Sequence, residues 1–424
     1  MNGMTDQAGE ERRSFIQDLL QEHFRRKATA ISRLGRDSNN FVYYVKLSSE
    51  RIDSVSELLP LPTRSPGTIA LPADVTEVVV RISNPEAMVN EEVRVQNEVA
   101  AMSLARQALA GYDQSLVPLV YAWSPSSGGR GWLVQEYKRG LQLDKAFGEL
   151  DREKQQDLIG QIAQVYKRIQ SYPLPDSVQG YGGLGFSPTT GDIITGPTTI
   201  PCGGPFACLD EMYSQMLRRQ LDESDTSTLL QGWRADGLRD RLERFASDGI
   251  MGLVRANSLS CRTLIHGDFN LFNILYDAPS NQLTALLDYD FSHIASPAEE
   301  YFYSFRTIGA LLTGPFEEGD EGRLRKCLLE GFEGNTGTEM HGRGRVNWEV
   351  ALMTDYEFYR AGVLRPADIP GCGELASLKW FLEDVSPPYF YMSRWLAGRT
   401  PEILGGMREE IRSNLDKYLL RWGF

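Results

Sequence analysis

Cysteine and histidine are scarce in this chain of 424 residues, which has five of the first and four of the second. The cysteines are odd in number and form no Cys-x-x-Cys pair; they are Cys202, Cys208, Cys261, Cys327 and Cys372. This usage is typical of a reducing compartment and argues against both a disulfide framework and a structural zinc site. We therefore expect a cytoplasmic protein.

Long apolar runs and an excess of basic residues are also missing. No run is long enough to span a bilayer, and residues 1–12 lack the apolar core of a signal peptide, which predicts a flexible tail. Acidic residues outnumber basic ones by 57 to 44, and the net charge is -13. Without a basic patch we expect neither a nucleic-acid nor a membrane partner. The charge suits a cationic small substrate, but it is equally ordinary for a soluble protein.

What the chain does contain is a polar loop between short apolar runs, His266-Gly-Asp-Phe-Asn-Leu-Phe-Asn273. A further apolar run at 283–287 ends at Asp288. Apolar runs of this length predict short buried strands. We expect the strands and the loop to bring Asp268, Asn273 and Asp288 together.

These three side chains match the needs of phosphoryl transfer. Magnesium prefers oxygen ligands in octahedral geometry and takes few of them from the protein. Asn273 offers a neutral carbonyl oxygen and Asp288 a carboxylate, so the pair can hold Mg²⁺. Asp268 is then left to face an acceptor, to orient its hydroxyl or amine and to accept the proton.

A simpler interpretation is that Asp268 and Asn273 cap a turn, as Asp and Asn often do. Three oxygen-bearing side chains at compatible spacing favour the catalytic interpretation. His266 is expected to make structural hydrogen bonds rather than to carry protons. Asp290 could support the metal ligands without binding the metal itself, or it could cap the end of a strand.

The spacing His-x-Asp-x-x-x-x-Asn matches the catalytic loop of protein kinases, but Gly267 replaces their Arg. The segment closely resembles the aminoglycoside phosphotransferase family, with its choline-kinase-like and fungal-type members, whose loop reads His-Gly-Asp-x-x-x-x-Asn. Ser296-Pro-Ala-Glu-Glu300 resembles that family's Asp-Pro-x-x-Asp element, with Ser and Glu in place of the two acids. The resemblance implies a kinase-like fold and an ATP-dependent reaction.

Strands predicted at 31–35 and 41–47 are joined by a polar turn. Such a unit can cover nucleotide phosphates and donate backbone N–H groups, here from Ser38, Asn39 and Asn40. Taken alone, the turn is better explained as a plain hairpin, because Gly35 is its only glycine. The run Asn40-Phe-Val-Tyr43 also resembles the corresponding loop of the family.

The strand predicted at 77–82 carries Arg81 where kinases place the lysine that grips nucleotide phosphates. Choline-kinase-like enzymes resemble this chain in having Arg there, and Arg adds a fork that can bind phosphate at two points. In the helix predicted at 91–109, Glu98 stands where kinase-like folds place the acid that pairs with this cation. The alternatives are an Arg that extends from a strand edge and a solvated Glu.

By element order and resemblance, 135–140 would form the hinge between lobes, with backbone groups near Glu136 and Tyr137 meeting the adenine edge. Composition predicts an insertion at 48–76 and a long loop at 179–205, and periodicity predicts a helix at 301–312. Aromatic clusters at 380–384 and 389–395 could hold an amine by cation–π contact, but such residues are more often core.

We therefore expect an α+β, bilobal, protein-kinase-like fold. Residues 13–137 would form the small nucleotide-binding sheet lobe, and 138–424 a larger, mainly helical lobe for catalysis and substrate binding. The predicted function is phosphorylation of a hydroxyl or amine on a small molecule, a metabolite or an antibiotic-like compound, by ATP with Mg²⁺. A catalytically inactive nucleotide-binding module is the alternative, and a protein kinase ranks lower because no Ala-Pro-Glu element follows Asp288. The choice between ATP and GTP, the acceptor and the oligomeric state stay open.

Overall fold

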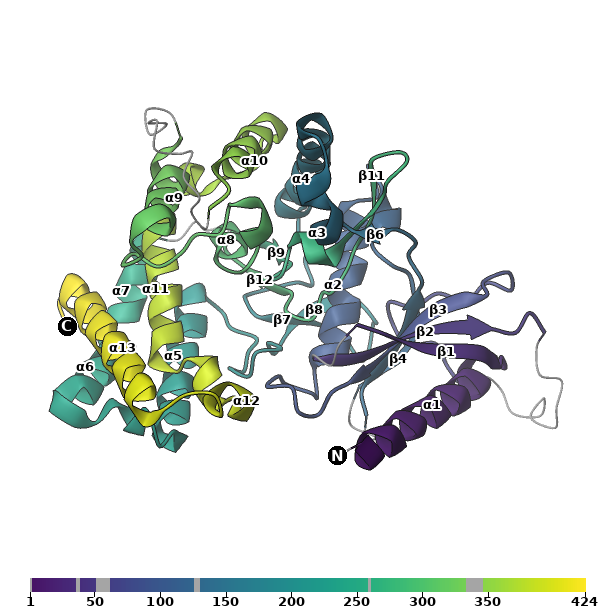
Figure 1. The fold of residues 1–424 in the computed structure, drawn as a ribbon, viewed down its shortest axis with the longest axis horizontal. Helices are drawn as coiled ribbons and strands as arrows, with labels where there is room; N and C mark the ends of the chain where they lie inside the picture. The colour runs from purple at the N-terminus through teal and green to yellow at the C-terminus, as the bar shows by residue number, and fades with distance from the viewer. Residues whose placement is uncertain (1, 36–38, 51–61, 126–129, 258–260, 333–345) are drawn as a thin grey trace.

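An antiparallel sheet forms the smaller lobe (Figure 1). Its strands are β1 (Ala28–Leu34), β2 (Asn40–Leu47), β3 (Glu77–Ser83), β4 (Val120–Ser124) and β5 (Trp132–Glu136), in the order β1-β2-β3-β5-β4. The computed structural model describes residues 2–35, 39–50, 62–125, 130–257, 261–332 and 346–424. The predicted insertion lies partly outside these ranges; its described parts, 48–50 and 62–76, have no helix or strand.

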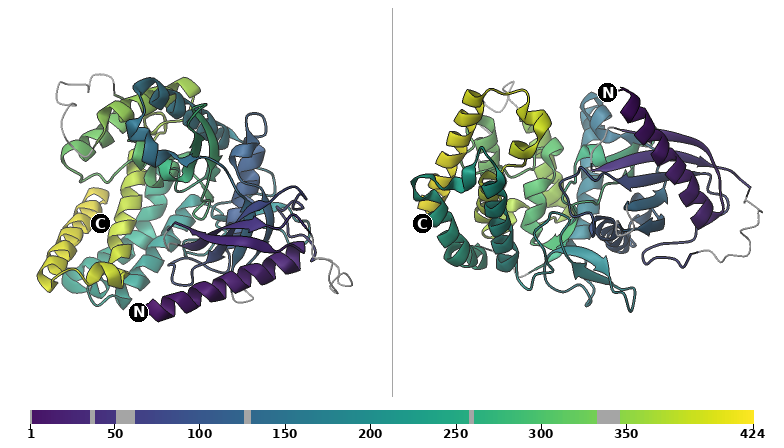
Figure 2. Two further views of the ribbon diagram at one scale, coloured as in Figure 1. Left: turned by 45° about the vertical axis from the view of Figure 1, so that its right-hand side comes forward. Right: turned by 90° about the horizontal axis from the view of Figure 1, so that it is seen from below.

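Helix α1 (Asn2–Phe24) covers one face of the sheet, as both views of Figure 2 show. Ile16, Leu19 and Leu20 are buried in a small core with Tyr43 and Val45 of β2. The helix begins at Asn2, so residues 2–12, expected as a flexible tail, are helical instead. The physical reason is that no proline interrupts residues 1–24, and packing of the apolar face stabilises the whole helix.

Helix α2 (Arg94–Ala108) stands between the sheet and the larger lobe (Figure 1). It is buried on most sides and belongs to the core of the larger lobe. The helices of that lobe are α3 (Leu143–Ala146), α4 (Arg152–Ser171), α5 (Leu209–Thr226), α6 (Leu238–Arg244), α7 (Ile250–Asn257), α8 (Glu300–Tyr303), α9 (Gly319–Glu330), α10 (Trp348–Ala361), α11 (Cys372–Val385), α12 (Ser393–Leu396) and α13 (Pro401–Trp422). The expected α+β bilobal fold is confirmed.

Short strands carry the loops of the larger lobe. They are β6 (Leu141–Gln142), β7 (Gly183–Phe186), β8 (Ile193–Gly196), β9 (Thr263–Ile265), β10 (Ile274–Asp277), β11 (Gln282–Leu286) and β12 (His293–Ala295). β10 pairs with β11 and β6, whereas β9 pairs with β12. The segment 179–205 is therefore not one long loop, because β7 and β8 form a hairpin within it.

The helix predicted at 301–312 is largely absent. α8 ends at Tyr303, and Phe305 adopts φ 63°, a left-handed conformation that ends a helix and is rare for a bulky residue. Hydrogen bonds to the loop that contains Asp268, described below, outweigh the helical periodicity.

Among the described residues, no helix is both long and apolar enough to cross a bilayer.

Candidate active site

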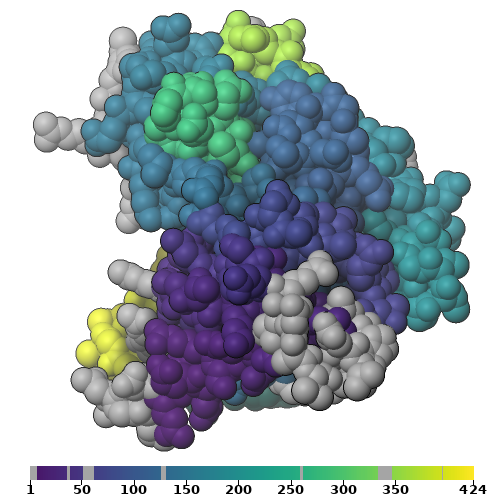
Figure 3. All heavy atoms as spheres, turned by 90° about the vertical axis from the view of Figure 1, so that its right-hand side faces the viewer, coloured from purple at the N-terminus to yellow at the C-terminus, as the bar shows by residue number. Residues whose placement is uncertain are grey.

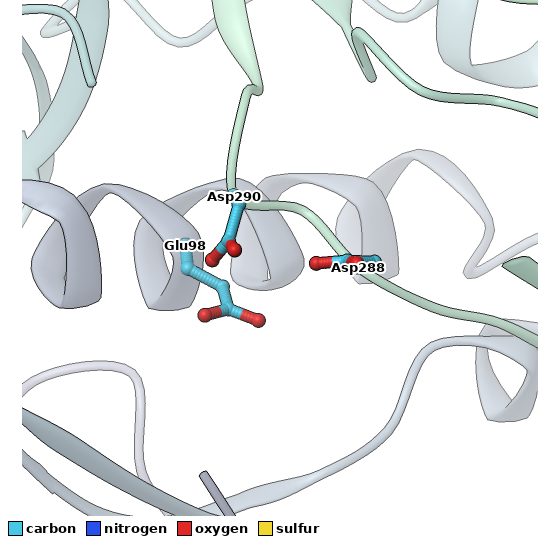
Figure 4. A group of neighbouring side chains, drawn as sticks. All are labelled: Glu98, Asp288 and Asp290. Carbon is cyan, nitrogen blue, oxygen red and sulfur yellow. The ribbon is translucent and has the colours of Figure 1, made fainter. Parts of the chain in front are cut away.

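Arg81 of β3 lies at the centre of a cluster of carboxylates. Its Nη1 is 2.6 Å from Oε1 of Glu98 on α2, and its Nη2 is 2.8 Å from Oδ1 of Asp288 and 3.3 Å from Oδ1 of Asp290. Figure 4 shows the three acids facing a common space, Glu98 from α2 and the other two from the segment after β11. Arg81 and Glu98, which the sequence predicted as a pair, are in contact.

Burial and charge compete in this cluster. Burial alone would lower the pKa of Arg81, but the carboxylates of Glu98, Asp288 and Asp290 raise it above its usual value. Burial raises the pKa of Glu98 and of Asp290, and the charge of Arg81 opposes the rise in both. Arg81 contacts all three acids and the charge of Arg94 also acts on Asp290, so the negative charge around Asp288 is only partly balanced.

Asp268 lies in the loop between β9 and β10 and is held by two amides. Nδ2 of Asn270 donates to its Oδ1 at 2.8 Å, and Nδ2 of Asn273 donates to its Oδ2 at 2.8 Å and to its backbone oxygen at 2.9 Å. Burial raises the pKa of Asp268 to about 6, and the charge of Asp288 adds to the rise while both amides oppose it. The carboxylate is thus fixed in orientation and is a stronger base than an exposed aspartate.

His266 serves the backbone of the same loop. Its Nδ1 accepts the N–H of Asp268 at 3.2 Å, so Nε2 is the donor to the backbone oxygen of Leu287 at 3.1 Å. Burial lowers the pKa of His266 to about 4. The imidazole is therefore neutral at pH 7, and it links the loop to the residue before Asp288.

Glu300 holds the first turn of the loop from the other side. Its carboxylate accepts the N–H of His266 at 2.7 Å and that of Gly267 at 3.0 Å, and it also accepts the hydroxyl of Ser304. Ser296 caps the short helix before Glu300 by accepting the N–H of Ala298. Ser296 and Glu300, which stand where the family has its two acids, thus both have hydrogen-bond partners.

The segment after α8 is bonded to the second half of the loop. The hydroxyls of Ser304 and Thr307 accept the N–H groups of Phe269 at 2.8 Å and Leu271 at 2.9 Å, and the N–H of Phe305 donates to the Phe269 oxygen at 2.9 Å. These bonds require the chain to reverse at Phe305, which explains its left-handed backbone. These bonds also hold the loop in place against the aromatic core.

The side-chain amide of Asn40 and the backbone oxygen of Asn39 are already engaged within the protein. Nδ2 of Asn40 donates to Oδ2 of Asp290 at 2.8 Å, and the backbone oxygen of Asn39 accepts from Arg94 and from the N–H of Asn84. Asn40, at the start of β2, therefore connects this end of the sheet to the carboxylate cluster. Ser38 lies outside the described residues.

Glu136 and Tyr137 lie where the chain leaves β5 for the larger lobe. The N–H of Glu136 donates to the oxygen of Leu119 at 2.8 Å, so this N–H is already used within the sheet. The ring of Tyr137 meets that of Tyr44 edge-on, with centroids 4.8 Å apart. In the space-filling view of Figure 3, the outline is notched between the purple N-terminal residues and the blue residues above them.

The donor set fits a hard divalent cation. Glu98, Asp288 and Asp290 offer oxygens within 4.8 Å of one another, and the two hydrogen bonds of Asn273 to Asp268 use Nδ2 and not Oδ1. The Asp288 side chain is 42% exposed, whereas those of Glu98 and Asp290 are buried. Asp288 is therefore the acid that a metal could reach first. All donors are oxygens, which is the chemistry that Mg²⁺ prefers.

Sequence spacing missed the residues that support the loop. Asn270 carries no distinguishing signal, and Thr307 was expected inside a helix. By contrast, His266 was expected to make structural hydrogen bonds, and Glu300 had a signal through its place in the Ser-Pro-Ala-Glu-Glu element.

The model of the phosphotransferase enzyme family matches residues 68–326, about six tenths of the chain. A comparison with curated proteins gives no match.

Solved structures with a similar course of the chain include a protein of Ralstonia eutropha described as an aminoglycoside phosphotransferase by inference, with 12% identity and a TM-score of 0.48 over 96% of this chain and 97% of that one. A thermostable mutant of APH(4)-Ia with AMP-PNP and hygromycin B shares 13% identity, with a TM-score of 0.45 over 96% and 98% of the two chains. The gentamicin complex of APH(2'')-IIa shares 12%, with a TM-score of 0.47 over 94% of each chain.

Proposed function

This chain belongs to the phosphotransferase enzyme family, and we propose that it transfers the γ-phosphoryl group of ATP to a hydroxyl or amine of a small molecule with the help of Mg²⁺. The observation that carries the proposal is the fixed orientation of the Asp268 carboxylate. Its carboxylate is fixed by Asn270 and Asn273 in a loop that is itself anchored to the strand leading to Asp288.

Asp268 is the proposed catalytic base. It would accept a hydrogen bond from the acceptor's O–H or N–H and take the proton as the bond to phosphorus forms. A pKa of about 6 leaves Asp268 mostly ionised at pH 7 while making it more basic than an ordinary aspartate. The hydrogen bonds from Asn270 and Asn273 would keep one lone pair directed at the acceptor.

Asn273 and Asp288 are the proposed metal ligands, through Oδ1 of the first and the carboxylate of the second. When bound, Mg²⁺ would neutralise charge on the β- and γ-phosphates. Asp290 would stay behind them, because Asn40 and Arg81 already hold its two oxygens. Metal binding requires Asp288 to exchange part of its contact with Arg81.

Arg81 would then turn its free hydrogen-bonding capacity to nucleotide phosphate while Glu98 keeps it in place. The backbone of 38–40 would cover the phosphates, and the linker at Glu136 and Tyr137 would meet the base. The burial of Arg81, which is 7% exposed, supports this assignment. A buried guanidinium that contacts several acids is held in one place and is not surrounded by water.

A nucleotide-binding module without turnover is the second candidate. The observation that favours it is the contact of Arg81 with Asp288, because while Asp288 engages the guanidinium, Arg81 would not position a bound phosphate for transfer. The two candidates agree on Mg²⁺-dependent ATP binding and differ on chemistry. An assay for transfer of the phosphoryl group therefore separates the two candidates.

The test incubates the full chain with Mg²⁺, ATP labelled on its γ-phosphate and a panel of small alcohols and amines. The proposal expects a labelled acceptor with the natural chain and none with Asp268→Asn. Asp277→Asn is the matched control, because the carboxylate of Asp277 accepts hydrogen bonds from Ser280 in a surface turn. Nucleotide binding without labelled product on any acceptor, and without release of phosphate to water, would favour the module.

A further inference from the structure

Asn97 is fully buried in α2 and directly precedes Glu98 in the chain. Successive residues of an α-helix point about 100° apart around the helix axis, so the two side chains leave α2 in different directions. Glu98 reaches Arg81 of the small lobe, whereas the side chain of Asn97 reaches residues of the larger lobe. One short stretch of α2 therefore contacts both lobes.

The amide of Asn97 joins α2 to three other segments. Its Nδ2 donates to the backbone oxygen of Ser292 at 2.9 Å and to Oγ1 of Thr199 at 3.2 Å. Its Oδ1 accepts the N–H of Leu184 in β7 at 2.5 Å. Because the backbone oxygen needs a donor and the backbone N–H needs an acceptor, this position requires a side chain that has both.

Ser292 lies two residues after Asp290, at the end of the segment that also carries Asp288. Its hydroxyl donates to the backbone oxygen of His266 at 3.1 Å, and its own backbone oxygen accepts the bond from Asn97. Ser292 is buried, so both bonds are shielded from water. The segment is thus tied to the loop that contains Asp268 by a side chain and to α2 through its backbone.

Strand β7 runs beside α2 and holds Asn97 from a further side (Figure 1). A Cβ added to Gly183 of β7 would lie 3.0 Å from Oδ1 of Asn97 and 2.1 Å from the backbone oxygen of Pro197, so the close approach depends on glycine. Just before β7, Gly182 pairs with Ile294 of β12. The hairpin of β7 and β8 therefore contacts both Asn97 and the strand that follows the acidic segment.

We propose that Asn97 is a positioning residue, which holds the segment 288–292 against α2. Glu98 of the same helix contacts Arg81, which in turn contacts Asp288. A movement of the segment along α2 would therefore change the geometry at Arg81 as well as break the bond from Asn97. The consequence for metal binding rests on the proposed function, in which Asp288 is a ligand, whereas the anchoring of the segment does not.

The test compares Asn97→Leu with the natural chain and with the matched control Gln170→Met. Gln170 is also a buried amide: its Nε2 donates to the hydroxyl of Tyr166 and to the backbone oxygen of Leu364, and its Oε1 accepts the N–H of Leu364. Each variant replaces an amide by an apolar side chain of similar size. Each also removes a hydrogen-bond partner of one backbone N–H and of one backbone oxygen.

Hydrogen exchange followed by mass spectrometry measures local opening of 288–292, and electron paramagnetic resonance of Mn²⁺ with AMP-PNP measures metal binding. Since a buried hydrogen bond is lost at the segment, Asn97→Leu should exchange about ten-fold faster there and bind Mn²⁺ about ten-fold more weakly. Gln170→Met should lose a similar amount of thermal stability, while both other readouts match those of the natural chain. Asn97→Ser, with a shorter side chain, provides the same comparison if Asn97→Leu does not fold.

Three results would overturn the proposal. They are exchange in 288–292 that is the same in the Asn97 variant and the natural chain, exchange that rises equally in Gln170→Met, and faster exchange with unchanged Mn²⁺ binding. If the natural chain itself takes up no Mn²⁺ with AMP-PNP while exchange responds to Asn97→Leu, the anchoring by Asn97 is supported and the proposed function fails.

Discussion

Nη2 of Arg81 lies 2.8 Å from Oδ1 of Asp288, although the two residues are 207 positions apart. The contact joins the sheet of the small lobe to the segment of the large one that carries Asp288, the proposed metal ligand. Since Nη1 of the same guanidinium holds Glu98, α2 is tied into the same assembly. The position of α2 and the geometry around Asp288 thus depend on one side chain.

Arg81→Met should destabilise the chain by about 3–5 kcal/mol, because Glu98 and Asp290 would be left buried without their cation. Urea unfolding at pH 7 measures the change. Arg139→Met is the control: Arg139 also pairs with an acid, Glu77, but is 78% exposed, and its loss should cost no more than about 1 kcal/mol. Equal losses in the two variants would contradict the assigned burial of the cluster.

Turnover should fall on acidification, with the acid limb of kcat/KM near pH 6. Asp268 must be ionised to accept a proton, and burial raises its pKa to about 6. Asn270→Ala removes a hydrogen bond that lowers this pKa, so the limb should move to higher pH. A pH–rate profile of both proteins makes the comparison, and an unmoved limb would show that another group titrates.

The same shift has a consequence for stability. A carboxyl with a raised folded-state pKa favours folding when protonated, and this contribution is lost as pH rises from the unfolded value of about 4 through about 6. Asp268→Asn should therefore be more stable relative to the natural chain at pH 7.5 than at pH 4.5. Denaturant unfolding at the two pH values measures the difference.

Gly267→Ala should destabilise the catalytic loop by about 1–3 kcal/mol. Gly267 has φ 80°, and an added Cβ would lie 2.7 Å from the backbone oxygen of Phe291, which cannot move without disturbing Asp290. Gly252→Ala in α7 meets nothing within 4 Å and should be neutral or stabilise by up to about 1 kcal/mol. Unfolding free energies that rank these variants in the opposite order would contradict the loop geometry.

Glu300→Gln should lower kcat more than it lowers nucleotide affinity. The carboxylate accepts two backbone N–H groups and the Ser304 hydroxyl, and an amide has one oxygen to replace two. Leaving one buried N–H without an acceptor costs about 1–3 kcal/mol and loosens the turn before Asp268. Steady-state kinetics with ATP varied separate the two effects; a change confined to the KM for ATP would place Glu300 elsewhere in the mechanism.

Local spacing predicted the pairs that the fold brings together in this site. Asp268 and Asn273 are five residues apart in one loop, and strand ends predicted the convergence with Asp288. Arg81 and Glu98 followed from element order. Their chemical environment was less predictable: the backbone of Asn40 stays a predicted phosphate contact, but the bond of its side-chain amide to Asp290, a contact across 250 residues, had no sequence signal.

The departures have a common physical cause. The periodicity at 301–312 is helical, but hydrogen bonds from Ser304 and Thr307 to the catalytic loop determine the backbone there. Likewise, residues 2–12 are polar, and their helix is stabilised by the apolar face that follows at Ile16, Leu19 and Leu20. Tertiary contacts outweigh local preference in both places.

The central claim is that Asp288, with Asn273, binds the divalent cation that accompanies the nucleotide. Electron paramagnetic resonance of Mn²⁺ with AMP-PNP tests it most directly, with the natural chain, Asp288→Asn and the control Asp277→Asn. The account predicts that the natural chain and Asp277→Asn take up Mn²⁺ in a nucleotide-dependent manner and that Asp288→Asn binds it at least ten-fold more weakly. Equal Mn²⁺ binding by Asp288→Asn and the natural chain would contradict it.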